Sequence, residues 1–420
     1  MSRGRRPRRR VIRRRRLGVG RRGSLRRRRR SGTQRIWVAG VVVAVVLALA
    51  AASAAVWLVK HRLQPESGLG GTVFYTAQTA NEGGVEIGGS LEVMLKVAGL
   101  AHQSVKLVRI DGDGAVTSSL VDMTPRLDDK ADGEPLKVRQ RADDAIERTI
   151  GRIQATLNGS SSKYAGQTLF NGLSRIQVDT SKPVFIYSSG LDTSNPVDFR
   201  KLAFDVSPKM LADDLRSAGE LPSMPRAAVT FVITPSSGQQ QALRRPQMVY
   251  REAVWDTLLR AAGAASVHFE YPDGLPSQST KVAPVVPVPP PIGTPVPVRS
   301  SAPGEKTCTL SAGTYFEADK AVLLNRQATL AALKPCVAKI RPTTRVTVEG
   351  HTSSVAKKSN NPVAVALSTQ RAQVVAGVLE QLGVSRNQLT VKGYGNANQP
   401  FPDPSDPRNR SVVVRFKSAS

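Results

Sequence analysis

A stretch of 24 residues without a charged side chain, residues 36–59, limits what the first part of this chain can form. A helix of that length is about 36 Å long, enough to cross a hydrocarbon core of roughly 30 Å with some tilt. Trp37 and Trp57 lie near its two ends, where indole rings favour the headgroup layer of a membrane. We therefore expect a transmembrane helix over residues 36–59.

The same stretch admits a second interpretation, a signal peptide that is removed from the mature protein. Arg21-Arg22-Gly23-Ser24-Leu25 faintly resembles a twin-arginine signal, and Ala52-Ser53-Ala54 has the small residues of a cleavage site. The apolar stretch is longer than the usual hydrophobic region of a signal and continues to Val59. A retained anchor is therefore the preferred prediction.

Residues 1–35 contain 18 arginines and no acidic residue, so they hold most of the chain's formal charge of +28. A run of like charges cannot pack into a core, and we expect a disordered tail. By the positive-inside rule this tail lies in the cytoplasm, which places everything after Lys60 on the other side of the membrane. The sequence thus predicts a single-pass protein of the cell membrane whose bulk is extracytoplasmic.

The arginine tail also suggests partners. Each basic residue near anionic lipid contributes about 1 kcal/mol of attraction, so the cytoplasmic face of the membrane is the expected partner. A nucleic acid, bound through counterion release, or an acidic protein is the alternative. No aromatic residue is interleaved with the arginines, and without base stacking a nucleic acid is the weaker prediction.

The region between residues 60 and 271 alternates between apolar strands and amphipathic helices. In residues 142–157, for example, apolar side chains recur at three- and four-residue steps. Ser207 precedes Pro208 at an expected helix start, where serine is a preferred cap. Such alternation predicts an α/β, Rossmann-like domain with a mainly parallel sheet. Strands are expected over 105–110, 183–187, 227–233 and 266–271, and helices over 142–157, 207–218 and 246–262.

Residues 272–306 separate this domain from a C-terminal domain over residues 307–420. The segment contains ten prolines, a composition that favours extended polyproline II at about 3.1 Å per residue, so we expect a linker. Cys308 and Cys336 are the two cysteines of the chain. Outside the membrane an even pair predicts one disulfide, and two buried thiols are the alternative.

Four short motifs follow one another in the C-terminal region: Gly350-His351-Thr352, Leu367-Ser368-Thr369-Gln370-Arg371-Ala372, Gly393-Tyr394-Gly395 and Asn409-Arg410. Their order and spacing resemble the OmpA-like (OmpA/MotB C-terminal) domain, a family that grips the stem peptide of peptidoglycan. The resemblance runs over residues 307–416 and implies an α+β fold of βαβαββ order. It places an opening strand and acidic turn over 314–320, helices over 325–339 and 368–382, and strands over 345–349, 388–393 and 411–416.

The resemblance also implies a binding site. In the family, an arginine of the Leu-Ser-x-x-Arg-Ala motif pairs with a carboxylate of diaminopimelate, and Arg371 matches it. A guanidinium suits this role because its planar fork donates two charge-assisted hydrogen bonds to one carboxylate. Thr352 matches the motif threonine, and Glu317 stands where the family often has an acid near the pocket. Asn409 and Arg410 match the closing motif.

Two positions depart from the family. Ser353 stands where an aspartate pairs with the ammonium group of diaminopimelate, and Ala364 replaces an asparagine. A serine cannot neutralise an ammonium group, so Glu317 would have to supply the negative charge. We therefore expect Arg371 to hold a carboxylate of an altered stem peptide, such as an amidated or lysine-containing one. A fold that has lost ligand binding is the alternative.

The middle region also resembles a known family. Its turn at Asp111 and its segments 166–173 and 183–190 are similar to those of a von Willebrand factor type A-like domain. The metal site of that family uses an Asp-x-Ser-x-Ser loop, a threonine and an aspartate. Here the first loop would be Asp111, Asp113 and Ala115, without its serines; Thr168 fits the second loop, and Ser189 replaces the aspartate. A hard divalent ion needs several converging oxygen ligands, so we expect no metal and interpret the domain as an interaction module.

Together these features favour a non-catalytic function. The chain is expected to tether the cell envelope to the peptidoglycan stem peptide through its C-terminal domain, with the middle domain binding a protein partner. The alternative is an assembly or secretion component whose arginine tail binds an acidic cytoplasmic partner. An enzyme is the third option, and neither paired carboxylates nor an activated nucleophile supports it, so no cofactor is expected.

Overall fold

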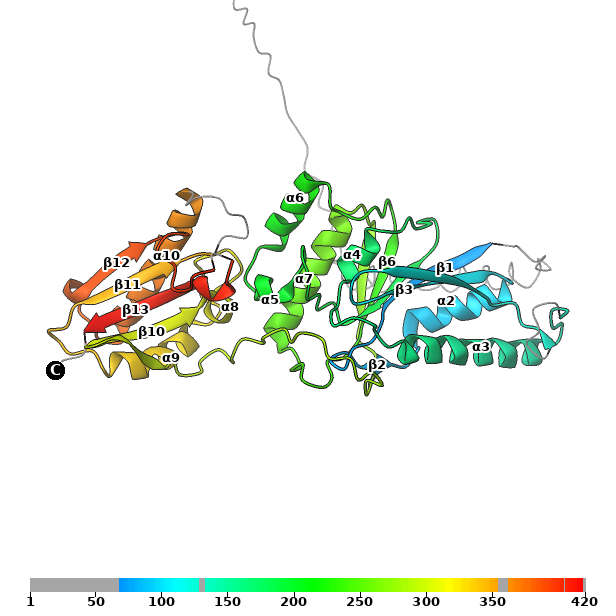
Figure 1. Ribbon diagram of the computed structural model, residues 1–420, viewed down its shortest axis with the longest axis horizontal. Helices are drawn as coiled ribbons and strands as arrows, with labels where there is room; N and C mark the ends of the chain where they lie inside the picture. Colours follow the sequence, from blue (N-terminus) through cyan, green and yellow to red (C-terminus); the bar gives the residue numbers. More distant parts are fainter. Residues whose placement is uncertain (1–67, 128–132, 354–361, 404, 418–420) are drawn as a thin grey trace, which may run out of the picture. The chain divides into compact units, whose positions relative to one another are not determined.

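The computed structural model describes residues 68–127, 133–353, 362–403 and 405–417 (Figure 1). The predicted arginine tail, residues 1–35, and the predicted transmembrane helix, residues 36–59, lie outside these ranges. Within them, every helix is too short or too polar to cross a membrane.

The middle region forms a six-stranded sheet. Its strand order is β4 (Val116–Asp122), β3 (Ser104–Ile110), β1 (Leu69–Thr76), β5 (Val184–Ser188), β6 (Ala228–Ile233) and β7 (Ser266–Glu270). Neighbouring strands from β3 to β7 are parallel, whereas β4 runs antiparallel to β3 at the edge. The predicted mainly parallel sheet is therefore confirmed.

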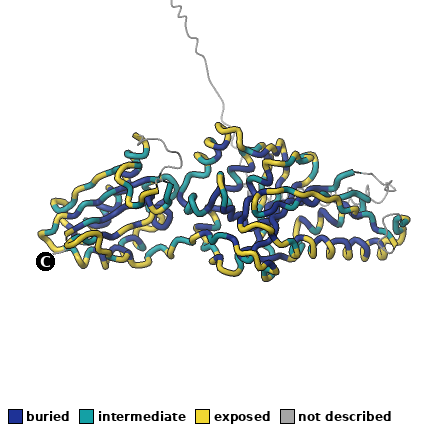
Figure 2. Tube along the Cα trace, in the orientation of Figure 1, coloured by how far each residue is buried: buried dark blue, intermediate teal, exposed yellow. Residues whose placement is uncertain are grey.

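Helices cover both faces of this sheet, because its strands carry apolar side chains on both faces. On one face α2 (Gly89–Leu100) and α3 (Arg139–Gly159) lie side by side and bury residues such as Leu95 and Ile153. On the other face lie α4 (Leu169–Leu173), α6 (Pro208–Ala218) and α7 (Arg245–Ala261), and Trp255 of α7 is fully buried there. Buried positions accordingly run along the central strands in Figure 2. The predicted Ser207 cap is confirmed, since its side chain accepts a hydrogen bond from Met210 N.

The central strand of the middle sheet, β1, differs from expectation. The pattern of apolar residues pointed to 105–110 as the first strand, but β1 precedes it and lies between β3 and β5. The turn at Asp111 therefore joins β3 to the antiparallel β4 and does not follow the first strand of the sheet. Glycine at positions 70 and 71 obscures β1 in the sequence. A Cβ added at Gly70 would lie 2.7 Å from the Cβ of Ala98 in α2, so the close packing of α2 on β1 requires glycine at this position.

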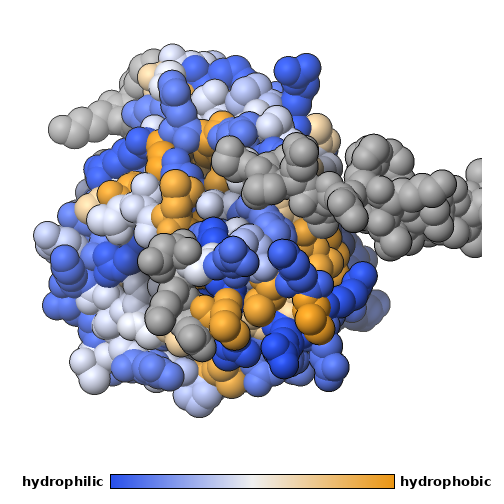
Figure 3. All heavy atoms as spheres, turned by 90° about the vertical axis from the view of Figure 1, so that its right-hand side faces the viewer, coloured by the Kyte–Doolittle hydropathy of each residue, from blue (hydrophilic) through white to orange (hydrophobic). Residues whose placement is uncertain are grey.

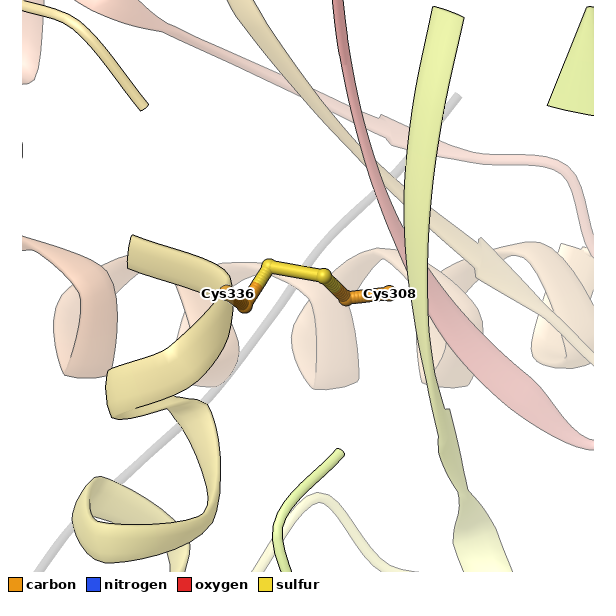
Figure 4. The surroundings of a disulfide bond; sticks show 2 residues. All are labelled: Cys308 and Cys336. Carbon is orange, nitrogen blue, oxygen red and sulfur yellow. A yellow bond between two sulfur atoms is a disulfide. The ribbon is translucent and has the colours of Figure 1, made fainter. Parts of the chain in front are cut away.

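The C-terminal region forms a five-stranded sheet with two long helices. Its order is β12 (Leu389–Gly393), β11 (Val346–His351), β13 (Ser411–Lys417), β10 (Glu305–Ser311) and β9 (Val298–Ala302). The helices α9 (Arg326–Val337) and α10 (Pro362–Gln381) contribute Leu333, Val375 and Leu379 to a shared core with the strands. A disulfide joins Cys308 of β10 to Cys336 of α9, with both residues fully buried (Figure 4).

Two details of this domain differ from the predicted elements. The opening strand is β10, and the segment that was expected to form it begins instead with the short helix α8 (Ala312–Tyr315). The neighbouring strand β13 is already fully paired with β10, so residues after Ser311 turn away and bury Tyr315 and Phe316 in the core. Helix α10 begins at Pro362, which places Arg371 in the third turn of the helix and not at its start.

The predicted linker is also more structured than its composition suggests. Strand β8 (Gly274–Leu275) pairs with β2 (Gly84–Val85) of the middle region, and β9 extends the C-terminal sheet. Between them, Val286 packs into the middle core and Val296 into the C-terminal core. Val286 N also donates to the side chain of Gln240. Residues 272–306 therefore differ from the free spacer expected for a proline-rich segment.

Candidate functional site

Arg371 is a buried arginine without a direct ion pair within the described ranges. Its side chain extends from α10 and is 1% exposed. Nε donates to the carbonyl oxygen of Lys320 at 2.9 Å, and the guanidinium lies 5.4 Å from the ring centroid of Phe316. Nη2 has no hydrogen-bond acceptor among the described residues. A buried cationic donor without a partner is costly, so this atom marks a place where an acceptor is expected.

Arg410 lies beside this site and uses all three of its nitrogens. It follows the 3-10 helix η3 (Pro407–Asn409) and is 5% exposed. Nε pairs with Asp205 Oδ1 at 2.5 Å, and Nη1 donates to Ser353 Oγ at 2.5 Å. Nη2 donates to the carbonyl oxygens of Lys201 at 2.6 Å and Leu202 at 3.0 Å. Each nitrogen of this second arginine of the predicted site thus has a protein acceptor.

Asp205 is the acid whose charge the two arginines stabilise. It is 2% exposed and follows helix α5 (Phe199–Leu202) of the middle region. Burial raises the pKa of Asp205 to about 6, while the charges of Arg410 and Arg371 act to lower it. Burial likewise lowers the pKa of Arg371, and the charges of Asp205 and Asp319 oppose that effect. The arrangement is therefore a buried carboxylate site with two cationic groups around it.

The other residues predicted for the site have different contacts. Thr352 is buried, and its Oγ1 lies 2.6 Å from Asn396 Oδ1. Glu317 pairs with Lys320 at 2.8 Å, and its side chain is 40% exposed. Asn409 accepts from Phe401 N and donates to backbone carbonyls of the same loop, so it holds that loop in place. Arg410 contacts Ser353 and, like Arg371, lies close enough to Asp205 to influence its pKa, whereas Asn409 contacts only its own loop in these bonds.

Two acids of the site were missed by the sequence analysis. Asp319 accepts a hydrogen bond from Ser207 N at 2.5 Å, and its own N–H donates to the Asp205 carbonyl oxygen. Its place two residues after Glu317 was the signal that could have identified it. Asp205 carries no motif, because its partner Arg410 lies 205 residues further along the chain.

A cavity of about 610 Å³ lies beside these residues but does not contain the arginines of the site. It is lined by the proline-rich segment, by Tyr315 and by residues before and within η3, including Asp406 and Arg408. Arg371 and Arg410 are absent from its lining. In this conformation the guanidinium of Arg371 is closed off from a large ligand.

The middle domain holds a second group of buried carboxyls at the ends of its central strands. Glu82 accepts hydrogen bonds from Thr76 Oγ1, Gln167 Nε2, Ser189 N and Thr234 Oγ1. Asp192 accepts from the backbone N–H groups of Leu169 and Phe170. The predicted first-loop residue Asp111 accepts from Ser162 Oγ and pairs with Arg109. The carboxylates near the segment that resembles a metal motif thus accept hydrogen bonds from protein donors. The described residues contain no group of three or more histidine, cysteine, aspartate or glutamate side chains that could hold a metal ion.

Burial of acids predicts a pH-dependent stability. Burial raises the pKa of Glu82, and it raises that of Asp192 to about 7 and that of Asp205 to about 6. The folded state then binds protons more tightly than the unfolded chain, so the free energy of unfolding should fall as the pH rises from about 5 to about 7. Urea unfolding across this window measures the slope. Asp192→Asn should flatten it, because an amide does not titrate, and a slope of the opposite sign in the wild type contradicts the expectation.

The comparisons with known proteins concern the C-terminal region. Residues 315–412 match the model of the OmpA family, so the C-terminal region from α8 to β13 contains an OmpA-family domain. The peptidoglycan-associated lipoprotein of Legionella pneumophila is 36% identical over 83 residues, which are 19% of this chain and 46% of that protein. The chain therefore spans less than half the length of this curated relative.

Solved structures with similarity to the chain include two from envelope proteins. The periplasmic domain of Helicobacter pylori MotB is 20% identical, and the match covers 30% of this chain and 89% of that chain, with a TM-score of 0.25. The cell wall anchor of the T6SS from Pseudomonas aeruginosa is 22% identical, with coverage of 30% and 88% and a TM-score of 0.25.

Proposed function

We propose that this chain is a non-catalytic tether that binds peptidoglycan through its C-terminal domain. The observation that carries the proposal is the buried guanidinium of Arg371 in an OmpA-family domain, whose Nη2 has no hydrogen-bond acceptor among the described residues. A buried cationic donor is costly to maintain unless an acceptor, such as a carboxylate, pairs with it. A stem peptide that carries a free carboxylate has the chemistry to do so.

The stem peptide that this site would take is an altered one, such as an amidated or lysine-containing peptide. Ser353 takes the place of the family's aspartate, and its hydroxyl accepts a hydrogen bond from Arg410. Glu317 pairs with Lys320, so its charge is already partly neutralised and is less available to an ammonium group. Asp319, which lies close enough to Arg371 to influence its pKa, is the better candidate for that role.

The remaining parts of the chain complete the tether. Residues 36–59 would anchor it in the cell membrane, with the arginine tail in the cytoplasm against anionic lipid. The middle domain would bind a protein partner as a von Willebrand factor type A-like module, a role supported by its parallel sheet with one antiparallel edge strand. The face in Figure 3 shows small hydrophobic patches among hydrophilic residues. Val93, Val97 and Leu120 of the middle domain are more than half exposed and are candidates for such contacts.

Replacing Arg371 tests the wall-binding proposal. Arg371→Met keeps an unbranched side chain in the buried position but removes the charge, so the affinity of the full chain for isolated sacculi should fall about tenfold or more. Co-sedimentation of detergent-solubilised protein with sacculi measures this affinity. Free diaminopimelate and its amide, added as competitors, distinguish the stem peptides.

The matched control for that experiment is Arg386→Met. Arg386 is an arginine of the same domain whose side chain is 77% exposed and pairs with Glu380. It carries the same charge, so a loss caused only by weaker attraction to anionic wall polymers would affect both variants equally. Equal retention of the wild type and Arg371→Met would reject Arg371 as the anchor.

The arginine tail favours a second candidate function, a component of envelope assembly or secretion. In that case the tail binds an acidic cytoplasmic partner, and the C-terminal domain only docks the complex to the wall. Deletion of residues 2–35, with a short positive flank retained before residue 36, separates the two. A tether keeps its wall association and its cellular role after the deletion, whereas an assembly component loses the role and keeps the association.

A further inference from the structure

The carboxylate inside the candidate site belongs to this chain itself. The 201–207 segment of the middle domain enters the C-terminal site and contacts it through both backbone and side chain. Arg410 donates to the carbonyl oxygens of Lys201 and Leu202 and pairs with the carboxylate of Asp205. On the other side, Asp319 exchanges hydrogen bonds with Asp205 O and Ser207 N. A side chain at Gly313 would meet Ala203 O at 2.4 Å, so the backbones are in close contact there.

The middle domain holds this segment in an unusual shape. Ala203 and Phe204 have φ angles of 47° and 62°, a left-handed conformation that residues with a Cβ seldom adopt. The ring of Phe204 packs at 6.1 Å from Phe199 and 5.7 Å from Tyr250, centroid to centroid. Tyr250 OH also donates to Val206 O at 2.7 Å. The segment is therefore presented by a fixed scaffold.

Asp205 leaves one donor of the site without an acceptor, which is not expected of a purely structural ion pair. Each nitrogen of Arg410 has a protein acceptor, but Arg371 influences Asp205 only through its charge, and Arg371 Nη2 has no acceptor among the described residues. A ligand with a carboxylate that reaches Arg371 directly would satisfy a donor that Asp205 leaves unpaired. Such a ligand can therefore compete with the internal one.

We propose that the 201–207 segment is an internal ligand of the C-terminal site, so that peptidoglycan binds only when the carboxylate of Asp205 leaves it. This inference rests on the proposed function, since it concerns the same guanidinium groups. It gives the middle domain a second role, because this domain then sets the fraction of molecules in which the wall-binding site is open. The apparent affinity for the wall is then the intrinsic affinity multiplied by that fraction.

Asp205→Asn tests the inference. The substitution preserves size but removes the charge that Arg410 and Arg371 attract, so the open fraction should increase. The full chain in detergent should then bind isolated sacculi about tenfold more tightly than the wild type. Asp256→Asn is the matched control, because Asp256 is an acid of α7 in the middle domain that pairs with Arg260 at 2.8 Å at the surface. Its affinity should equal that of the wild type.

Two additional measurements separate the possible results. Asp205→Asn combined with Arg371→Met should lose the gain, because the tighter binding passes through Arg371. Hydrogen exchange of residues 201–207 in the full chain should be slow in the wild type, and faster in Asp205→Asn and when soluble stem-peptide fragments of sacculi are added. The second readout does not depend on sedimentation, and it also reports whether the variant is folded elsewhere.

Each outcome decides the question. Tighter binding by Asp205→Asn, with faster exchange of residues 201–207, supports the internal ligand. Equal binding by the wild type and Asp205→Asn overturns it while the tether proposal stands. Exchange that stays slow in wild-type protein saturated with fragments also overturns it. If neither the wild type nor Asp205→Asn binds sacculi, the tether proposal and the inference fail together.

Discussion

Gly350→Ala should destabilise the C-terminal domain by about 3 kcal/mol or more, at the upper end of the usual cost of overpacking. Gly350 lies on β11 where α10 crosses it, and an added Cβ would lie 1.9 Å from Ser368 O and 2.6 Å from its carbonyl carbon. Backbone atoms cannot yield as a flexible side chain can, so the helix must move away from the sheet. Because Ser368 is one turn before Arg371, the same shift should also weaken wall binding.

Urea unfolding of the wild type and the variant measures this effect, with Gly377→Ala as the control. Gly377 lies on the same helix, and an added Cβ there meets no other atom within 4 Å. Alanine is favoured over glycine inside a helix by roughly 0.5–1 kcal/mol, so this variant should be slightly more stable than the wild type. Equal stability of Gly350→Ala and the wild type would show that the two elements do not approach so closely.

Loss of the disulfide should have a comparable effect. The bond between Cys308 and Cys336 spans a sequence separation of 28 residues, and closing a loop of that length stabilises a fold by roughly 3–4 kcal/mol in the chain-entropy account. The double replacement of both cysteines by alanine should therefore lower the free energy of unfolding of this domain by at least that amount. The added loss of buried contacts acts in the same direction.

Reduction offers an independent measurement of the same contribution. Urea unfolding of the wild type with and without a thiol reductant should give different midpoints, with the reduced protein less stable. The double alanine variant is the control, since a reductant has nothing to cleave in it. Identical midpoints for oxidised and reduced wild type would mean that the bond does not constrain the unfolded chain.

Sequence periodicity located several regular elements of the middle region, because helices and strands each repeat apolar residues at a fixed step. The helix expected over 142–157 lies inside α3, and the strand expected over 105–110 lies inside β3. Periodicity missed β1, whose glycines serve helix packing, and the family resemblance placed a strand at residues 314–316, where the pairing of β10 with β13 had already ended. Both failures come from tertiary packing that a local window does not contain.

Part of the site was predictable from motifs that resemble a known family. Arg371, Thr352 and Arg410 belong to motifs with recognisable spacing, and they could be named from the sequence. Asp205 belongs to no motif, and its importance arises from a contact between residues far apart in the chain. Glu82 was missed because a lone glutamate in a loop looks exposed. Its burial depends on four separate segments that supply hydrogen bonds to it.

Strand β9 would have a mechanical consequence if the chain links the membrane to the wall as proposed. It is an edge strand, it pairs only with β10 among the described strands, and a short turn around Gly304 joins the two as a hairpin. Tension transmitted along the proline-rich segment would load the hydrogen bonds between β9 and β10 one after another and not all at once. The hairpin would then open before the rest of the domain and lengthen the tether, which would cushion the wall attachment against sudden stretch.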